Sequence, residues 1–283
     1  MTTVRLAFSP DADDAFMFHA LLTGAVTEPG LEFVAETADT ETLNARADAG
    51  DVDVLAVSIA RYASIADRWL LLPHGMSVGR GYGPVVVRRA DTKLASLADL
   101  AGRRVAVPGL RTTANLVLRL LAPAFEGVVV PIAPFDRVFG ALRSGDVDAA
   151  VLIHEGRLTY EREGFALVAD LGAEWARETS LPLPLGGNVI RRALGPDVIA
   201  RTSRACRASI AWALAHKGEV VEALSRRDER DLGRALLDRY LDLYANDDTA
   251  TLHPDVARAV ALLFVKGHEK GLIDRAAAPE YAP

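Results

Sequence analysis

The segment Ala49-Gly50-Asp51-Val52-Asp53 returns later in the chain as Ser144-Gly145-Asp146-Val147-Asp148, and this repeat decides the fold. In each copy the glycine ends a helical pattern, and the residues after it open an apolar strand. Glycine stops a helix readily because it adopts the left-handed conformation without a side-chain clash. The match is short, so the inference of a duplicated chain also rests on the order of the elements around each copy.

The same order of elements surrounds both copies. In the first half, strands are predicted at residues 4–8, 31–36 and 52–58, with one helix from about Ala15 and another at residues 40–49. Asp13 or Asp14 is expected to cap the first of these helices. In the second half, strands are predicted at residues 104–107, 128–132 and 147–153, with helices at residues 112–121 and 138–143. We therefore expect an α/β chain built from two similar halves.

Two glycine-led apolar strands, residues 83–89 and 186–192, follow the two halves and are predicted to cross between lobes. They divide the chain into a large lobe of residues 1–89 and 186–283 and a small lobe of residues 90–185. Helices predicted at residues 198–215, 220–224, 231–244 and 254–267 would support the large lobe. The last residues, 276–283, are expected to form a loosely held tail.

Composition excludes several classes of protein. The 283 residues are 50% hydrophobic and 25% charged with a formal net charge of −6, which is typical of a folded protein without the basic surface of a nucleic-acid binder. The single cysteine, Cys206, excludes an intrachain disulfide and a cysteine metal cluster. The N-terminus lacks the pattern of a secretion signal and no apolar run reaches membrane-spanning length, so we expect a cytoplasmic protein.

Open α/β sheets bind ligands beyond the carboxyl ends of their strands. Applied to the predicted strands, this rule selects residues 9–14, Ser58, residues 109–113, and His154 with Glu155. All four loops are expected to face one cleft between the lobes, which makes a small molecule the expected partner. The oligomeric state is left open.

Thr112 and Thr113 stand at the start of a predicted helix, where unpaired N–H groups and the helix dipole favour an anion. Their hydroxyls are therefore candidates to bind a carboxylate. The alternative is that one threonine caps its own helix, which is a frequent use of threonine at this position. The sequence leaves both interpretations open.

His154 follows an apolar strand and precedes Glu155, so a titratable imidazole is expected where a buried strand meets the cleft. Imidazole is suited to proton abstraction near neutral pH, and we predict that His154 is the catalytic base. Glu155 or a backbone carbonyl is expected to fix its tautomer. The alternative is a histidine that bonds only to structural partners at the end of its strand.

Asp11, Asp13 and Asp14 offer the carboxylates that hard cations prefer, but their spacing lacks the glycine and the distal glutamate of a calcium loop. Helix capping is the favoured role for at least one of them, and no metal is expected. There is no G-x-x-x-x-G-K phosphate loop, and the run Gly79-Arg80-Gly81-Tyr82-Gly83 precedes no predicted helix. A nucleotide cofactor is therefore not expected, and the run instead predicts a turn into the first crossing strand.

Motifs in five parts of the chain occur in an order and spacing that fit a known family. Three of them are Ser9-Pro10 with Asp14 and Phe16, Gly79-Arg80-Gly81 with Gly83-Pro84, and Val107-Pro108-Gly109 with Thr112-Thr113-Ala114. The two most distinctive are Ile153-His154-Glu155 with Arg157 and Thr159-Tyr160, and Leu181-Pro182-Leu183-Pro184-Leu185-Gly186. Over nearly the whole chain, the sequence resembles the 1,4-dihydroxy-6-naphthoate synthase family of the futalosine route to menaquinone.

The resemblance implies a two-lobed, type II periplasmic-binding-protein-like α/β fold and a carbon–carbon lyase that needs no cofactor. The implied reaction cleaves cyclic dehypoxanthine futalosine, an aromatic carboxylate, to 1,4-dihydroxy-6-naphthoate and a three-carbon sugar fragment. The family histidine that matches His154 is the base. The family segments that match Ala56, Val57 and Ser58 and the pair Thr112 and Thr113 contact substrate. Ser9 and Asp14, which the strand rule places at the cleft, complete the predicted substrate-binding set.

Two places differ from the usual sequence of the family. Ala56 stands where the family usually has lysine, and Asp11-Ala12-Asp13 stands where it usually has Cys-Pro-Asn. The first change removes a positive charge that would face an anionic substrate, and the second adds a negative one. Arg61, Arg80 and Arg111 are candidates to supply the positive charge.

Two other functions are compatible with this fold, because a fold does not decide a function. One is a solute receptor of an uptake system, against which the missing secretion signal argues. The other is the sister enzyme chorismate dehydratase, which shares the fold and also works without a cofactor. The segments around His154 and from Leu181 to Gly186 favour the synthase.

Overall fold

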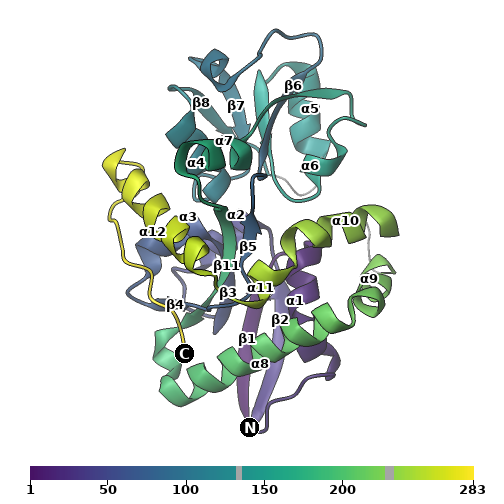
Figure 1. Cartoon of the computed structure of the whole chain (residues 1–283), viewed down its shortest axis with the longest axis vertical. Helices are drawn as coiled ribbons and strands as arrows, with labels where there is room; N and C mark the ends of the chain where they lie inside the picture. The colour runs from purple at the N-terminus through teal and green to yellow at the C-terminus, as the bar shows by residue number, and fades with distance from the viewer. Residues whose placement is uncertain (132–135, 227–232) are drawn as a thin grey trace.

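The computed structural model describes residues 1–131, 136–226 and 233–283. These residues form two β-sheets, each flanked by helices, that lie one above the other along the long axis of the molecule (Figure 1). Both chain termini lie in the lower half, beside the larger sheet (Figure 1). No helix among the described residues combines the length and the apolar character needed to cross a membrane.

The lower sheet has six strands in the order β2-β1-β3-β11-β4, with β5 paired to β11. Strands β2, β1 and β3 are parallel, and β11 runs antiparallel to β3. The bounds are β1 (Thr2–Phe8), β2 (Leu31–Thr37), β3 (Val54–Ser58), β4 (Trp69–Leu71), β5 (Ser77–Gly79) and β11 (Leu183–Arg191). All five residues of β3 are buried, as expected for an apolar strand covered on both faces.

The upper sheet has five strands in the order β10-β6-β9-β7-β8. Their bounds are β6 (Val85–Arg89), β7 (Arg104–Val107), β8 (Glu126–Val129), β9 (Ala149–Leu152) and β10 (Phe165–Asp170). The arrangement β8-β7-β9-β6 copies β2-β1-β3-β11, with three parallel strands followed by one antiparallel strand. The predicted duplication of the element order is thus confirmed.

The repeated segment makes the same backbone contacts in both sheets. Gly50 and Gly145 have φ of 64° and 78°, the left-handed conformation predicted for a glycine that ends a helix. Asp53 Oδ2 accepts a hydrogen bond from the N–H of Arg5 at 2.9 Å, and Asp148 Oδ2 accepts one from the N–H of Arg104 at 2.9 Å. In each half, the last aspartate of the repeat therefore joins the third strand to the first.

Helices cover both sheets. The helices that precede the second crossing are α1 (Ala12–Thr23), α2 (Thr40–Arg46), α3 (Ile59–Ile65), α4 (Thr113–Leu121), α5 (Asp136–Ser144), α6 (Gly156–Thr159) and α7 (Leu171–Thr179). Those that follow it are α8 (Pro196–Ala215), α9 (Lys217–Ser225), α10 (Arg234–Tyr244), α11 (Asp247–Ala250) and α12 (Pro254–Glu269). Helix α8 packs on α1, whereas α12 reaches up along the side of the molecule to α3 and α4 (Figure 1).

Several predicted boundaries need correction. The first helix begins at Ala12, so Asp11 is its N-cap residue, and Asp13 and Asp14 lie in its first turn. Carboxylates are favourable in that turn because the helix dipole is positive there. Helix α3, which follows β3 directly, is absent from the prediction. Residue 132 of one predicted strand and residues 231–232 of one predicted helix lie outside the described residues.

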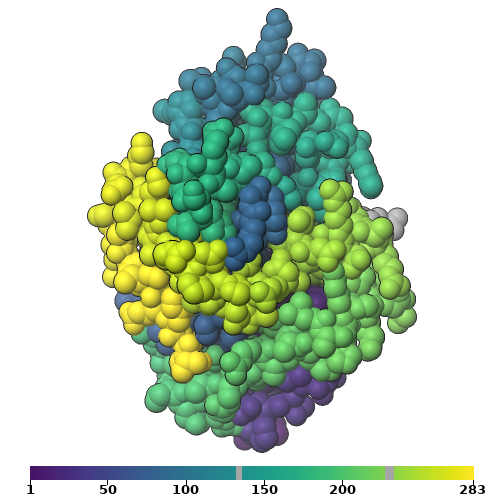
Figure 2. Space-filling model, in the orientation of Figure 1, coloured from purple at the N-terminus to yellow at the C-terminus, as the bar shows by residue number. Residues whose placement is uncertain are grey.

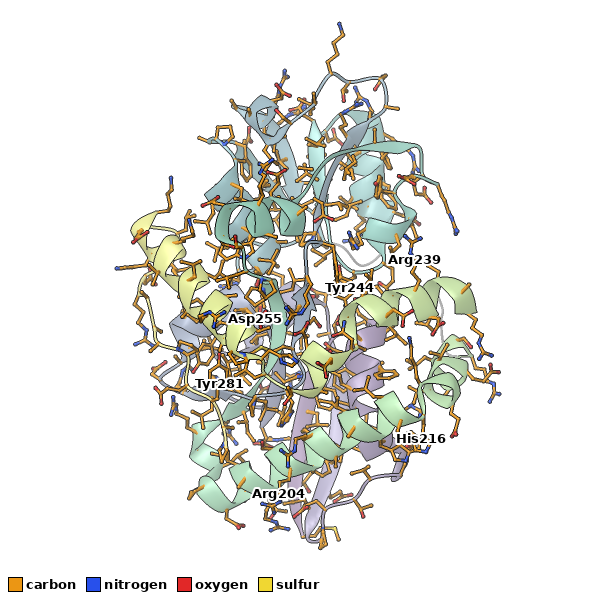
Figure 3. All side chains as sticks on the ribbon, in the orientation of Figure 1. Arg204, His216, Arg239, Tyr244, Asp255 and Tyr281 are labelled. Carbon is orange, nitrogen blue, oxygen red and sulfur yellow. The ribbon has the colours of Figure 1, made fainter. Side chains whose placement is uncertain are left out.

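The C-terminal residues are held in place, so the predicted loose tail is wrong. Leu71 donates its N–H to the carbonyl of Glu280 at 2.9 Å, and Ala282 donates its N–H to the carbonyl of Leu71 at 2.7 Å. The Tyr62 hydroxyl donates to the Glu280 carbonyl at 3.1 Å. These bonds occupy backbone groups of β4, the edge strand, which would otherwise lack partners. Tyr281 is labelled beside this edge in Figure 3.

The chain passes between the sheets before each predicted crossing strand. Strand β6 pairs only with β9 and β10 in the upper sheet, and β11 pairs only with β3, β4 and β5 in the lower one. The passages are therefore the segment between β5 and β6 and the segment between α7 and β11. The division into lobes of residues 1–89 with 186–283 and residues 90–185 stays a prediction, and the pairing of β6 favours a first boundary near Gly83.

Glycines at the first passage serve close backbone packing. A Cβ atom on Gly79 would lie 1.8 Å from the Tyr82 carbonyl oxygen, and one on Gly172 would lie 1.9 Å from the same oxygen. Gly83 lies against the backbone of Gly172, where a Cβ atom would be 2.9 Å from the Gly172 nitrogen. Of the run predicted to form a turn, only Gly81 has a positive φ, at 78°.

We predict that Gly172→Ala lowers the free energy of unfolding by about 1–3 kcal/mol, because the added methyl group must displace the backbone at Tyr82. The matched control is Gly140→Ala in the exposed middle of α5, where a Cβ atom would have no neighbour within 4 Å. That change should stabilise the protein by about 0.5–1 kcal/mol through helix propensity. Urea unfolding of both variants measures the difference, and equal midpoints would contradict the argument.

Candidate active site

The carboxyl ends of strands from both sheets converge on one cavity of about 100 Å³. All eight residues predicted for the site line it, from the segments at the carboxyl ends of β1, β3, β7 and β9: Ser9, Asp14, Ala56, Val57, Ser58, Thr112, Thr113 and His154. This volume is below the roughly 300–1,000 Å³ that is typical of ligand sites. In Figure 2 the upper and lower halves meet across the face that is shown.

His154 has an unusual backbone conformation. Its φ is 51°, and Ser180, at the end of α7, is the only other non-glycine residue with positive φ in the described part of the chain. Such a conformation is sparsely populated for residues with a Cβ atom and persists only where the surroundings hold it. It turns the imidazole from the end of β9 into the cavity, and the side chain remains 17% exposed.

Both ring nitrogens of His154 have partners from the lower half of the molecule. Nδ1 lies 3.0 Å from Asp11 Oδ2 and 3.4 Å from the Tyr240 hydroxyl, and Nε2 lies 3.2 Å from the Thr40 hydroxyl. Asp11 Oδ2 also accepts a hydrogen bond from the Ser9 hydroxyl. The carboxylate at hydrogen-bond distance from Nδ1 is thus Asp11, whereas the sequence predicted Glu155 or a backbone carbonyl as the partner that fixes the tautomer.

These neighbours control the charge of the imidazole. Burial by itself lowers the pKa of His154, but the attraction and hydrogen bond of Asp11, followed by the charges of Glu155 and Asp13, raise it to about 9. A pKa of about 9 means that the ring is protonated at neutral pH. A proton acceptor of this kind works best at alkaline pH, where more of it is in the neutral form.

Asp13 and Asp14 lie in the first turn of α1 and line the cavity. Asp13 accepts hydrogen bonds from the Tyr240 hydroxyl at 3.0 Å and the Ser77 hydroxyl at 2.6 Å, whereas Asp14 accepts one from the N–H of Ser9 at 2.9 Å. Burial, followed by the charges of neighbouring aspartates, raises the pKa of both carboxyl groups, of Asp14 most strongly. Both therefore hold a proton to higher pH than an exposed aspartate does.

The two threonines use their hydroxyls within the protein. Thr112 caps α4 by accepting from the N–H of Asn115 at 3.2 Å, which confirms the capping interpretation for this residue. The Thr113 hydroxyl donates to the Leu185 carbonyl at 2.7 Å and accepts from the N–H of Ala60 at 3.1 Å. Thr113 thus joins α4 of the upper half to α3 and β11 of the lower half. Carboxylate binding by these hydroxyls stays a prediction.

The carboxyl end of β3 is also fixed by the protein itself. Ser58 accepts a hydrogen bond from the Asn44 side chain at 3.0 Å and donates its own N–H to that side chain at 2.9 Å. Ala56 and Val57 are buried and pair with β11, where Asn188 and Gly187 face them.

The three arginines proposed to replace the missing lysine lie outside the cavity lining. Arg61 pairs with Asp48 at 2.6 Å. Arg80 pairs with Asp248 at 2.6 Å, and Arg111 pairs with Glu41 at 3.3 Å. That expectation is therefore corrected, since each of these guanidinium groups is held at a carboxylate elsewhere.

Lining residues without a counterpart in the sequence prediction include Thr40, Tyr240 and Tyr244. Thr40 opens α2, and both tyrosines come from α10, where Tyr244 is labelled at the level at which the two halves meet (Figure 3). The tyrosines lie on one face of α10 at a spacing of four residues, so they look like ordinary core positions in the sequence.

Residues 4–269 match the family described as menaquinone biosynthesis. The chain is 40% identical to the 1,4-dihydroxy-6-naphthoate synthase of Thermus thermophilus over 284 aligned residues, which cover 100% of this chain and 99% of that protein. It is 39% identical to the enzyme of the same name from Streptomyces coelicolor, over 96% of this chain and 95% of that protein.

Solved structures agree with the predicted fold. A protein of Archaeoglobus fulgidus superposes with a TM-score of 0.88 at 42% identity, covering 96% of this chain and 98% of that one. The alkanesulfonate-binding protein of Xanthomonas axonopodis, solved with MOPS, superposes with a TM-score of 0.74 at 13% identity, covering 99% of this chain and 96% of that one. The two-lobed periplasmic-binding-protein-like fold is thereby confirmed, and the second similarity concerns the fold alone.

We predict that Thr113→Val lowers the free energy of unfolding by about 1–3 kcal/mol for each backbone group that it leaves without a partner. The two groups are the N–H of Ala60 and the carbonyl of Leu185. Thr113→Ser, which keeps the hydroxyl, is the matched control and should lose much less. Thermal unfolding at constant pH measures both, and equal stability of the two variants would show that these bonds contribute nothing.

The raised pKa of His154 predicts a characteristic dependence of stability on pH. Because the folded protein holds this proton up to about pH 9 and the unfolded chain releases it near 6.5, the contribution is complete below pH 6.5 and is lost as the pH rises to 9. Wild type should therefore lose stability relative to His154→Gln across that interval. Unfolding midpoints from pH 6 to 10 test this, and parallel curves would contradict it.

Proposed function

The chain belongs to the menaquinone-biosynthesis family, and from this membership we propose that it cleaves cyclic dehypoxanthine futalosine to 1,4-dihydroxy-6-naphthoate and a three-carbon sugar fragment. The observation that carries the proposal is His154, a buried imidazole in a cavity lined by every residue of the predicted site. Sequence identity of 39–40% to two synthases over nearly their full lengths supports it independently.

His154 is proposed as the base through Nε2, the ring nitrogen away from Asp11. The proton of a substrate hydroxyl moves to Nε2, and the oxygen forms a carbonyl as the adjacent carbon–carbon bond breaks. The electron pair of that bond stays on the departing carbon, to which the imidazolium returns the proton. The exchange is balanced within substrate and imidazole, so it requires no oxidant or reductant.

The remaining lining suits an aromatic carboxylate. Leu43, Ile153 and Leu185 supply apolar surface for a planar ring system. Thr113 and Ala114, in the first turn of α4, line the same cavity, where the unpaired N–H groups and the positive dipole end of a helix start favour a carboxylate group. The substrate-binding roles of Ser9, Asp14, Ala56, Val57, Ser58, Thr112 and Thr113 belong to this proposal, as does action in the cytoplasm.

The alternatives differ in what they require of His154. A solute receptor needs no proton acceptor at the ligand, whereas this cavity holds an imidazole paired with a carboxylate at 3.0 Å. The similarity to the alkanesulfonate-binding protein, at 13% identity, carries no information about a ligand. Chorismate dehydratase is tested by including chorismate as a second substrate.

We predict that the purified protein converts cyclic dehypoxanthine futalosine to 1,4-dihydroxy-6-naphthoate, followed by the absorbance of the naphthoate, and leaves chorismate unchanged. His154→Asn should lower kcat by about 10² to 10⁴, because a positioned general base contributes a factor of this size. His253→Asn is the control, since His253 pairs with Asp247 at 2.8 Å outside the cavity. Turnover by His154→Asn close to that of wild type would refute the assignment of the base.

A further inference from the structure

We propose that Asp11 is a positioning residue that reaches across the cleft, holds the imidazole of His154 by Nδ1, and so directs Nε2 to take the substrate proton. The catalytic role of Asp11 rests on the proposed function, whereas the contact between Asp11 and His154 does not. Asp11 would act through His154 without touching the substrate, in the manner of the carboxylate that orients a catalytic histidine in hydrolases.

The geometry of the pair supports this role. Asp11 Oδ2 lies 3.0 Å from His154 Nδ1, and the two side chains are only 7% and 17% exposed. The Ser9 hydroxyl donates to the same oxygen, so the carboxylate is itself held in position. A charged acceptor fixed in this way holds the Nδ1 proton and stabilises the imidazolium that forms when Nε2 takes a second proton.

The other groups around His154 are less suited to orient the ring. The Tyr240 hydroxyl is farther from Nδ1, at 3.4 Å, and donates its proton to Asp13 at 3.0 Å. Glu155 is adjacent in sequence and acts on the ring through its charge. Thr40 lies at the opposite nitrogen, 3.2 Å from Nε2, where the substrate hydroxyl is expected to bind.

The pair forms between the two halves of the molecule. Asp11 follows β1 of the lower sheet, whereas His154 follows β9 of the upper sheet. Arg111 and Glu41, which are 3.3 Å apart, also pair across this cleft. Asp11 and His154 therefore pair only while the two halves lie together, as they do in this structure.

The charge of Asp11 matters to this role, because a neutral side chain would supply neither the charge nor the acceptor strength of a carboxylate. The titratable groups that face His154 are Asp11 from the loop after β1, Asp13 and Asp14 from α1, Tyr240 from α10, and the adjacent Glu155. Of these, Asp11 contributes most to the raised pKa.

Nuclear magnetic resonance of ¹⁵N-histidine-labelled protein tests the contact without substrate. In wild type, the resonance that disappears in His154→Gln should titrate near pH 9, with the proton on Nδ1 in the neutral form. In Asp11→Asn, the midpoint should fall by about 1 to 3 pH units. Asp48→Asn, which removes an exposed carboxylate that pairs with Arg61 and Arg68, is the control and should leave it unchanged. Should Asp11→Asn fail to fold, Asp11→Ser replaces it.

Enzyme kinetics distinguish a positioning role of Asp11 from a purely structural one. In wild type, kcat/KM for cyclic dehypoxanthine futalosine should rise with pH to a plateau above about 9, and in Asp11→Asn the rise should move to lower pH while the plateau falls by about 10² to 10⁴. KM should change little. An unaltered His154 titration and pH profile in Asp11→Asn would overturn the inference. A shifted titration in a protein without activity on this substrate would instead refute the proposed function and support the contact.

Discussion

The relative position of the two sheets is constrained by a backbone contact that joins the end of β5 and the first passage to the first turn of α7. The Tyr82 carbonyl lies so close to Gly79 and Gly172 that a Cβ atom on either glycine would come within 1.9 Å of its oxygen. The N–H of Leu171 donates to the Pro84 carbonyl at 2.8 Å beside this contact. Close packing of backbone on backbone leaves little freedom in how the start of the upper sheet lies against α7. The cavity, which is bounded by loops from both sheets, inherits its shape from this contact.

Duplication explains why loops distant in the sequence share one cavity. Each half contributes three parallel strands in the same order, and parallel strands end at the same edge of their sheet. With the two halves facing each other, the loops after β1, β3, β7 and β9 meet. This geometry made the site predictable, because the repeated Gly-Asp-Val-Asp segment and the apolar strands locate those loops in the sequence. His154, Ser58 and Thr113 were found for this reason.

The features that the sequence did not predict depend on contacts between distant residues, which leave no pattern in the sequence near either residue. The pairing of Asp11 with His154 joins residues 143 positions apart, and nothing in the pattern around either residue specifies the other. Tyr240 belongs to a helix whose apolar face is indistinguishable from a core face until α10 is placed beside the cleft. The C-terminal residues have the composition of a tail, yet their backbone is hydrogen-bonded to the edge of β4. Bonds between backbone groups leave no side-chain pattern in the sequence, so this contact could not be predicted.

The charge balance of the cavity follows from these same contacts. Asp13 and Asp14 would repel an anionic ligand if both were ionised, and the arginines near the site are engaged outside the lining. Burial raises the pKa of both aspartates, which favours their neutral forms, while Asp11 keeps the His154 ring cationic. An imidazolium and the amino-terminal end of α4 then provide positive potential where a lysine is absent at position 56. Asp11 and the imidazolium together carry no net charge, so Asp11 adds no net negative charge to the cavity, while the second proton of the imidazolium, on Nε2, lies on the side away from Asp11.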